Sequence, residues 1–267
     1  VEMIINLRYK LYHYNFLKKY SFDIPIISVG NLSLGGSGKT PMVGWIFDQL
    51  QQKNKKPCII SRGYQRKSYK LICISDDNTN LYTLDDIGDE PYMLLQNHNK
   101  VNMVIGDNKI ESIKYAINNL DIDCIILDDA FQSLYIQKDL DIVMHNALLT
   151  KEEYHLFPYG KLREKLQSLK RADIVVLTKF LDGIVKKNLE KFNLHKSKDI
   201  KIFQSTENFS IHENGKLVSL ENIKGKSIIG ICGIGHPASF WLAIEMMKIK
   251  IDKKMVFKNH HRYTKKN

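Results

Sequence analysis

The sequence predicts an α/β protein with a mostly parallel sheet flanked by helices and a smaller C-terminal α/β subdomain. Two observations support this fold class. Short apolar runs, which suit buried parallel strands, alternate with longer segments of helical spacing. Beyond position 201 the alternation gives way to an Asn-Gly pair between two short extended runs, which indicates a hairpin and a second unit.

The expected elements follow in order along the chain. Buried strands are predicted at 24–29, 58–60, 101–105, 124–127, 140–144 and 174–177, and crossover helices at 40–53, 90–97, 108–120 and 181–191. The later unit is predicted to hold a strand at 202–204, hairpin strands at 209–212 and 216–219, a strand at 227–232 and a helix at 237–247. The expected division is an N-terminal membrane-associating helix at 1–20, a core at 21–200 and a C-terminal subdomain at 201–267.

The composition is that of an ordinary folded protein with an excess of basic residues. Of its 267 residues 43% are hydrophobic, and 40 Lys and Arg against 29 Asp and Glu give a formal charge of +11. This charge favours nucleic acid, phosphorylated lipid or an anionic membrane as partners, without choosing among them. The four cysteines are far apart and show no CxxC spacing, which fits a reducing, cytoplasmic compartment. No run approaches the roughly 18 apolar residues needed to cross a bilayer.

Residues 3–20 mix apolar and aromatic side chains with Arg8, Lys10, Lys18 and Lys19. This pattern suits a helix that lies in a membrane interface, and it also suits a helix packed on the core. The sequence leaves both interpretations open. The chain starts on Val1 rather than Met, so residues upstream of it are expected.

The predicted strand 24–29 leads into a glycine-rich segment at 30–41, and a helical stretch follows. This order is the context of a phosphate-binding loop, which makes the expected fold P-loop NTPase-like. The glycines let backbone amides approach phosphate oxygens, Lys39 places a charge on the β- and γ-phosphates of a nucleotide, and Thr40 offers a hydroxyl to Mg²⁺. Ser33 replaces the first glycine of the usual pattern, and the alternative is a glycine-rich turn without a ligand. The residues expected to bind nucleotide are Gly35, Gly36, Ser37, Gly38, Lys39 and Thr40.

The apolar run at 124–127 ends in Asp128 and Asp129. P-loop proteins hold Mg²⁺ with a carboxylate at such a strand end, so one of the pair is expected to contact the metal or its waters. The alternative is a helix cap or a pair of solvated charges. Gln132 follows shortly and is expected to orient water or phosphate.

Six short motifs resemble, in order, those of the tetraacyldisaccharide 4'-kinases. They are 30–41, Ser61-Arg62-Gly63-Tyr64, Gly88-Asp89-Glu90-Pro91, 128–132, Leu162-Arg163-Glu164 and His260-His261-Arg262-Tyr263-Thr264. The resemblance implies transfer of the γ-phosphate of Mg²⁺-bound ATP to the 4'-hydroxyl of an acylated disaccharide 1-phosphate lipid, giving lipid IV-A in lipid A biosynthesis. It also implies a peripheral, monotopic protein at the cytoplasmic face of the bacterial inner membrane, and neither nucleic acid nor a protein partner is expected.

The resemblance also implies roles for individual residues. Asp89 is the expected base for the sugar hydroxyl, oriented by His260, and Lys39 and Arg163 complete the catalytic set. Glu164 is expected to steady Arg163 or the Mg²⁺ shell. The metal residues implied are Thr40, Asp128, Asp129 and Glu164, and those implied for substrate binding are Arg62, Tyr64 and Gln132. Without the other motifs, a helix cap is the favoured interpretation of Asp89, and a surface charge that of Arg62 and Arg163.

The chain departs from the family's motifs at four positions, Asn259, Ala130, Ser133 and Gln65, where Asp, Gly, His and Gly are usual. The Asn259 change weakens the expected support of His260. Family members also continue beyond the last motif, so the unit at 201–267 is expected to be incomplete.

Two other functions compete with that of a kinase. A GTPase or metallochaperone needs an Asp four positions into a base-reading motif, and Thr178-Lys179-Phe180-Leu181 has Leu there. A basic module that binds nucleic acid or membrane leaves the phosphate loop and the acidic pair unexplained.

Overall fold

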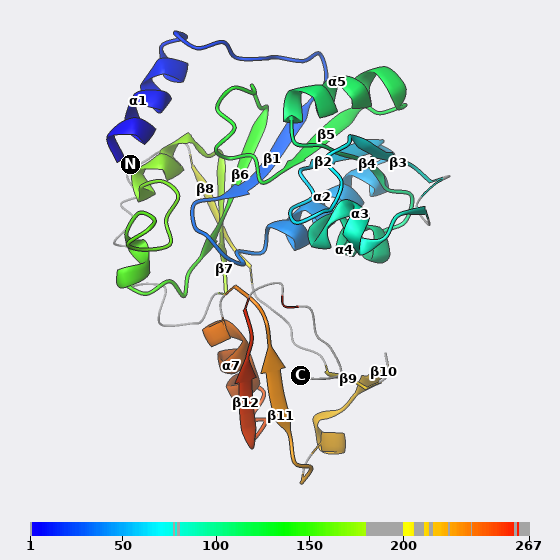
Figure 1. Cartoon of the computed structure of the whole chain (residues 1–267), viewed down its shortest axis with the longest axis vertical. Helices are drawn as coiled ribbons and strands as arrows, with labels where there is room; N and C mark the ends of the chain where they lie inside the picture. Colours follow the sequence, from blue (N-terminus) through cyan, green and yellow to red (C-terminus); the bar gives the residue numbers. More distant parts are fainter. Residues whose placement is uncertain are drawn as a thin grey trace.

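The computed structural model describes residues 2–76, 78, 81–179, 200–205, 211–213, 216–223, 225–235, 237–258 and 261. They form a large lobe around an eight-stranded sheet and a smaller lobe towards the C-terminal end of the chain (Figure 1). The predicted helix at 181–191 and the Asn-Gly pair of the predicted hairpin lie outside the described residues.

The elements of the large lobe largely match the predicted ones. Its strands are β1 (Ile26–Asn31), β2 (Pro57–Ser61), β3 (Ile72–Ile74), β4 (Asn102–Ile105), β5 (Cys124–Asp128), β6 (Leu140–Asn146), β7 (Ile174–Thr178) and β8 (Lys201–Gln204). Its helices are α1 (Glu2–His13), α2 (Lys39–Gln52), α3 (Leu84–Ile87), α4 (Asp89–Asn97) and α5 (Lys109–Asn119). Short 3₁₀ turns lie at Glu152–Tyr154 and Leu166–Arg171.

The large sheet has the strand order β3-β4-β2-β5-β1-β6-β7-β8. Only β3, a short edge strand that the sequence analysis did not predict, is antiparallel to its neighbour. The mostly parallel sheet is therefore confirmed. Because β8 pairs with β7, the sheet continues a few residues past position 200, where the sequence analysis placed a boundary; the division into units otherwise stays a prediction.

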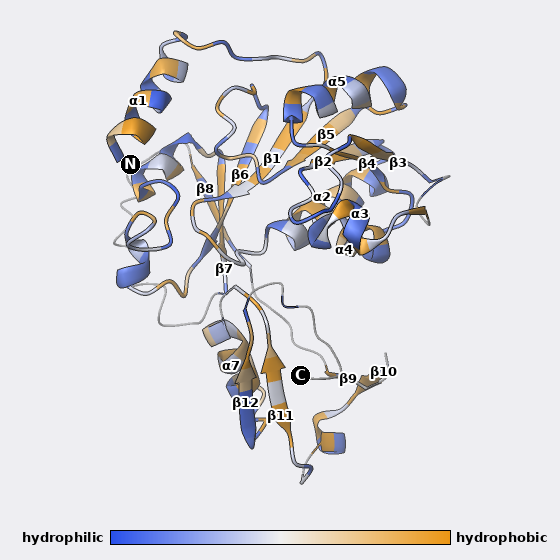
Figure 2. Cartoon of the chain, in the orientation of Figure 1, coloured by the Kyte–Doolittle hydropathy of each residue, from blue (hydrophilic) through white to orange (hydrophobic). Residues whose placement is uncertain are grey.

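Helices cover both faces of this sheet. Alternate residues of β2 point to opposite faces, so that Ile59 packs with Phe47 and Leu94 from α2 and α4, whereas Ile60 packs with Ile113 from α5. Strands buried on both faces, such as β2 and β5, accordingly consist almost entirely of apolar residues, which are orange in Figure 2. This burial holds the carboxyl ends of the strands in fixed register, which is where the functional residues lie.

The small lobe contains a hairpin and a βαβ unit. The hairpin pairs β9 (Ile211–Glu213) with β10 (Lys216–Val218), which confirms its prediction, and a 3₁₀ turn follows at Leu220–Ile223. The parallel strands β11 (Ile229–Cys232) and β12 (Lys253–Val256) are joined by α7 (Pro237–Met246). Lys179 Nζ, at the end of β7, donates a hydrogen bond to Ser239 Oγ of α7 over 2.7 Å and so links the two lobes.

Helix α1 ends at His13, so it is shorter than the predicted segment 3–20. None of its residues is fully buried, yet Tyr9 lies 5.3 Å from the Arg171 guanidinium, and Glu2 forms an ion pair with Lys165. Met3 and Ile4 remain 81% and 69% exposed. The helix therefore packs on the protein with one side and exposes apolar side chains on another. None of the described helices is long and apolar enough to cross a membrane.

Candidate active site

The glycine-rich loop connects the central strand β1 to α2, as the sequence predicts. Gly38 has φ of 81° and Gly35 has φ of 97°, in the left-handed region that glycine adopts without strain. Lys39 and Thr40 open α2 directly after Gly38, so the loop amides and the positive end of the helix dipole lie together. This is the backbone arrangement that cradles phosphate.

Contacts from neighbouring elements hold both ends of the loop. The Asn31 amide donates to Ser33 O over 2.7 Å and to Ser37 Oγ over 2.8 Å. Thr178 Oγ1, at the end of β7, donates to Ser37 O over 3.2 Å. Asn31 ends β1 and lies within the glycine-rich segment 30–41, but the sequence predicted no role for its side chain.

Asp128 ends β5 beside β1, with its Cα opposite Val29. Its residue is 6% exposed, Ser61 Oγ donates to Oδ2 over 3.0 Å, and Oδ1 has no hydrogen-bond partner among the described residues. Burial raises the pKa of Asp128, because the charged form loses its hydration. A buried carboxylate oxygen without a partner, next to a phosphate loop, fits a metal ligand.

Asp129 lies in a different environment from its neighbour. Its φ of 48° turns the chain, and its carboxylate accepts hydrogen bonds from Arg163 Nη1 at 3.0 and 3.1 Å and lies 3.7 Å from Lys39 Nζ. Burial alone would raise its pKa, but the charges of Lys39 and Arg163 hold the pKa of Asp129 below its usual value. Three of the predicted residues thus meet at the mouth of the loop.

Lys109 is a further candidate functional residue, which was not predicted from the sequence. It opens α5, is 7% exposed, and its Nζ donates to the Asp128 carbonyl over 2.8 Å. Burial lowers the pKa of Lys109, and the nearby cation Arg62 lowers it further, whereas Asp128 and Asp129 oppose these effects. In the sequence it was an unremarkable lysine at a helix start, with no signal of burial.

The loop after β2 meets the start of α4. Gly63 has φ of 67° and Gly88 has φ of 89°, and a Cβ at Gly88 would come within 2.6 Å of Tyr64 O. This close approach sets Asp89, the first residue of α4, beside segment 62–64, in which Arg62 and Tyr64 are exposed. Gln65 has φ of 62°, which gives a physical reason why glycine is usual at this position.

Two predicted residues have internal partners that differ from the expected ones. Gln132 Nε2 donates to Asn31 O over 2.9 Å, and Arg8 of α1 donates to Gln132 O over 3.1 Å, so Gln132 joins α1 to the phosphate strand. Glu164, 5% exposed, pairs with Arg171 at 2.8 Å, whereas Arg163 pairs with Asp129. The expectation that Glu164 steadies Arg163 is therefore not met by an ion pair between them.

His260 and Asn259 lie outside the described residues, so the expected pairing of Asp89 with His260 stays a prediction. In the described part of the chain, no three His, Cys, Asp or Glu residues gather as a metal cluster. A magnesium site in a P-loop protein does not require one, because phosphates and water supply most of its ligands.

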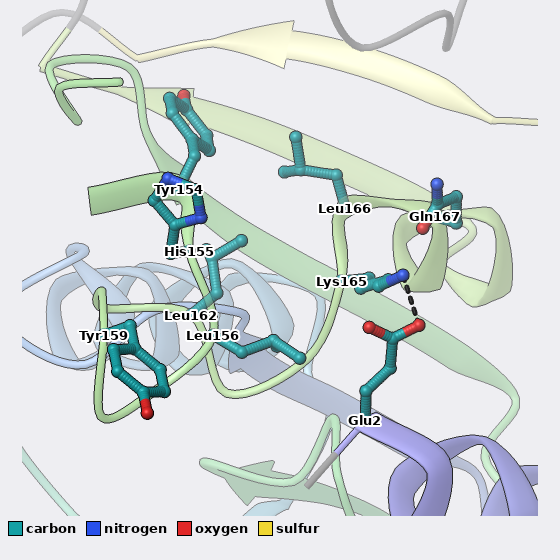
Figure 3. A pocket seen from close by; sticks show the side chains of 9 residues that line it. All are labelled: Glu2, Tyr154, His155, Leu156, Tyr159, Leu162, Lys165, Leu166 and Gln167. Carbon is teal, nitrogen blue, oxygen red and sulfur yellow. Dashed lines mark ion pairs between the residues drawn. The ribbon is translucent and has the colours of Figure 1, made fainter. Parts of the chain in front are cut away.

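A hollow of about 480 Å³ lies beside the first residue of α1. It is lined by both apolar and polar side chains, and the Glu2 to Lys165 ion pair crosses one side of it (Figure 3). Leu162, one of its lining residues, pairs in a short antiparallel bridge with Ser33 of the phosphate loop. The lining of the hollow thus includes one residue of α1, Glu2, and one residue that contacts the phosphate loop, Leu162.

Comparison with known proteins shows a family and several relatives to which the chain is similar. The whole chain, residues 1–267, matches the family described as tetraacyldisaccharide-1-P 4'-kinase. The tetraacyldisaccharide 4'-kinase of Aquifex aeolicus is 34% identical over 265 residues, which are 98% of this chain and 80% of the relative, and that of Halothermothrix orenii is 31% identical, with 98% and 72% covered. The crystal structure of "apo" form LpxK from Aquifex aeolicus in complex with ATP superimposes with a TM-score of 0.72 at 31% identity, covering 99% of this chain and 80% of that one.

Proposed function

The chain belongs to the tetraacyldisaccharide 4'-kinase family, and we propose that the residues gathered at its phosphate loop carry out the family's reaction. It is an ATP-dependent kinase that transfers the γ-phosphate to the 4'-hydroxyl of tetraacyldisaccharide 1-phosphate, forming lipid IV-A in lipid A biosynthesis. It uses ATP with Mg²⁺. The observation that carries the assignment of residues is the convergence of Lys39, Asp129 and Arg163 at the phosphate loop.

The phosphate-binding residues are Lys39, Arg163 and the backbone amides of 35–40. The Lys39 ammonium binds the β- and γ-phosphates as a point charge, and the planar Arg163 guanidinium supports the oxygens of the transferring phosphoryl group. Asp129 holds both cations in place before the nucleotide arrives, because its carboxylate contacts each of them. This fixed arrangement spares reorganisation when charge develops in the transition state.

The Mg²⁺ ligands from the protein are Asp128 and the Thr40 hydroxyl. The donor set fits, since Mg²⁺ prefers oxygen and is usually bound by one or two carboxylates together with phosphates and water. Asp128 Oδ1, buried and without a hydrogen-bond partner among the described residues, supports this assignment. When bound, Mg²⁺ neutralises charge on the β- and γ-phosphate oxygens. We assign Glu164 instead to Arg171, with which it pairs.

Asp89 is the proposed general base. It accepts the proton of the 4'-hydroxyl while the hydroxyl oxygen forms a bond to the γ-phosphorus, and the bond between that phosphorus and the bridging oxygen breaks, leaving its electron pair on ADP. His260 orients Asp89 or shares its proton in this proposal. Arg62 and Tyr64, next to Asp89 through the contact of Gly88 with the Tyr64 carbonyl, hold the sugar and phosphate of the lipid.

Helix α1 is the proposed membrane contact. Met3, Ile4 and Leu7 lie on one side of the helix and are 81%, 69% and 56% exposed. Together with the basic residues of segment 3–20 and the overall charge of +11, this side suits an anionic lipid surface. We infer a monotopic attachment at the cytoplasmic face of the inner membrane, where the acylated substrate lies. The absence of nucleic acid and protein partners stays a prediction.

One assay tests the proposal. The protein is incubated with γ-labelled ATP, Mg²⁺ and the detergent-dispersed disaccharide lipid, with Lys39→Ala and a reaction without lipid as controls. The expected result is a labelled lipid product that requires lipid, Mg²⁺ and Lys39. Label that appears only as inorganic phosphate would identify a hydrolase and overturn the assignment.

A further inference from the structure

Asn31 occupies an unusual position at the end of β1. It is 0% exposed, and its side-chain amide donates to Ser33 O at 2.7 Å and to Ser37 Oγ at 2.8 Å. Ser33 and Ser37 are themselves buried and lie at the two ends of the loop, whereas the residues between them, 34–36, are exposed. One side chain therefore forms hydrogen bonds to both ends of the phosphate loop.

The loop needs such a restraint. Its glycines give the backbone more freedom than any other residue type, and phosphate is bound by backbone amides that must point at one place. Ordering a flexible loop at the moment of binding costs affinity, and a loop ordered in advance avoids that cost. The Asn31 bonds are made entirely within the protein, so they act before ATP arrives.

Burying the Asn31 side-chain amide costs folding free energy, and the fold alone does not explain why this residue is kept there. Asn31 Oδ1 is buried and has no hydrogen-bond partner among the described residues. A buried acceptor without a partner is unfavourable, so a residue whose only task was to end a strand would be better replaced by an apolar one. The Asn31 backbone is also fixed, since its carbonyl accepts from Gln132 Nε2 at 2.9 Å.

We propose that Asn31 is a positioning residue for phosphoryl transfer, whose amide holds the phosphate loop in its nucleotide-binding shape before ATP binds. It acts through the backbone of 33–38 and does not touch the substrate. The bond to Ser33 needs a donor hydrogen, because the acceptor is the Ser33 carbonyl, which a carboxylate or an apolar side chain cannot bond. The inference rests on the proposed function to the extent that this loop binds ATP.

The test compares Asn31→Ala, Asn31→Asp and the matched control Asn78→Ala. Asn78 is a suitable control because its amide also donates to a backbone carbonyl, Cys73 O at 3.1 Å, and its Oδ1 accepts from Ser75 N at 2.9 Å, at the β3 edge of the sheet. The first readout is the dissociation constant of Mg²⁺-ATP by calorimetry. It is expected to rise about tenfold in both Asn31 variants, which corresponds to about 1.4 kcal/mol, and to stay at the wild-type value in Asn78→Ala.

Two further readouts separate positioning from a purely structural role. In the ATP-free protein, amide hydrogens of the peptide covering 33–40 should exchange faster in Asn31→Ala than in wild type, while peptides of α5 should not change. In lipid phosphorylation, KM for ATP should rise and KM for lipid should stay the same. A merely structural residue would lower the melting temperature without moving these values.

The outcomes are decisive in each direction. If only Asn31→Asp weakens ATP binding, charge repulsion explains the effect and the positioning role is overturned. Wild-type ATP affinity in a folded Asn31→Ala also overturns it. If neither Asn31 variant folds, Ser37→Ala removes one of the two bonds and should weaken ATP about threefold, and an unchanged affinity there rejects the proposal. A wild-type protein that binds ATP but does not label lipid would contradict the proposed function and leave this comparison intact.

Discussion

The substitution Lys109→Met is expected to lower the free energy of unfolding by an amount that the structure allows us to calculate. Lys109 is 7% exposed and donates a charged hydrogen bond to the Asp128 carbonyl over 2.8 Å. Met has a similar length and no donor, so the variant loses that bond and the Asp128 carbonyl loses its charged donor. A hydrogen bond to a charged group contributes about 1.5–3 kcal/mol, which gives a loss of about 2 kcal/mol. For a chain of this size the melting temperature should fall by about 4–8 °C.

The loss should be larger at pH 7.5 than at pH 5. Burial raises the pKa of Asp128 above its ordinary 3.8, so the ionised carboxylate costs folding free energy above the folded pKa and nothing below the unfolded pKa. The Lys109 charge lowers that pKa, and its removal enlarges the cost. Thermal unfolding followed by circular dichroism at the two pH values measures both effects.

Lys138→Met is the matched control. Lys138 is also a buried lysine that donates to a carbonyl of the same segment, Phe131 O at 3.3 Å, and pairs with Asp141 at 2.7 Å. It should lose stability as well, but only Lys109→Met should move the acidic limb of kcat/KM to higher pH, because Asp128 must be ionised to hold Mg²⁺. Wild-type melting of Lys109→Met, or an equal movement of the limb in both variants, would refute the reasoning.

Three further outcomes are expected. Asp89→Ala and His260→Ala should each lower kcat with little change in ATP binding. The fold-loss of kcat in the double variant should be far smaller than the product of the two single fold-losses. Fully multiplicative losses in the phosphorylation assay would assign the two residues separate roles. Asp128→Asn should reduce phosphoryl transfer by about 10² or more, and excess Mg²⁺ in a titration should not restore it; wild-type turnover would remove the metal assignment. Leu7→Asp should weaken liposome binding, measured by sedimentation, at least about tenfold, because an apolar side chain buried in the membrane contributes about 1.5–3 kcal/mol. Leu81, which is 73% exposed, is the control, and Leu81→Asp should leave liposome binding unchanged. Equal effects of the two substitutions would place the membrane contact elsewhere.

The features predictable from the sequence are those encoded by contiguous residues. The strand, the glycine-rich loop and Lys39 at the helix start form one local unit, so their geometry follows from residue types that lie next to each other. The apolar run ending in Asp128 is likewise local. Parallel pairing of β5 with β1 then brings the acidic pair beside the loop without further information.

The features that were missed depend on distant partners. Lys109 opens a helix, where a cation is unfavourable to the helix dipole, and only the packing of α5 over β2 and β4 gives it the Asp128 carbonyl as a partner. Gln132 has its partner 101 residues away, in Asn31. The end of α1 at His13 reflects packing of the following residues, where Tyr20 pairs with the 135–137 segment. Periodicity within one segment carries no record of such contacts.

The two aspartates at the end of β5 illustrate how one residue type acquires two tasks. Asp128 still follows the pleat of the strand and is buried, so its pKa is raised and one oxygen lacks a partner among the described residues. Asp129 has left the strand through its left-handed φ of 48° and faces Lys39 and Arg163, which lower its pKa. Neighbouring carboxyls whose environments shift their pKa values in opposite directions are suited to different work. A carboxylate that is already neutralised by two cations, as in Asp129, binds a metal ion weakly. A buried carboxylate oxygen without a hydrogen-bond partner, as in Asp128, is stabilised most by a metal ion. The different roles of the two residues therefore follow from a single backbone turn between them.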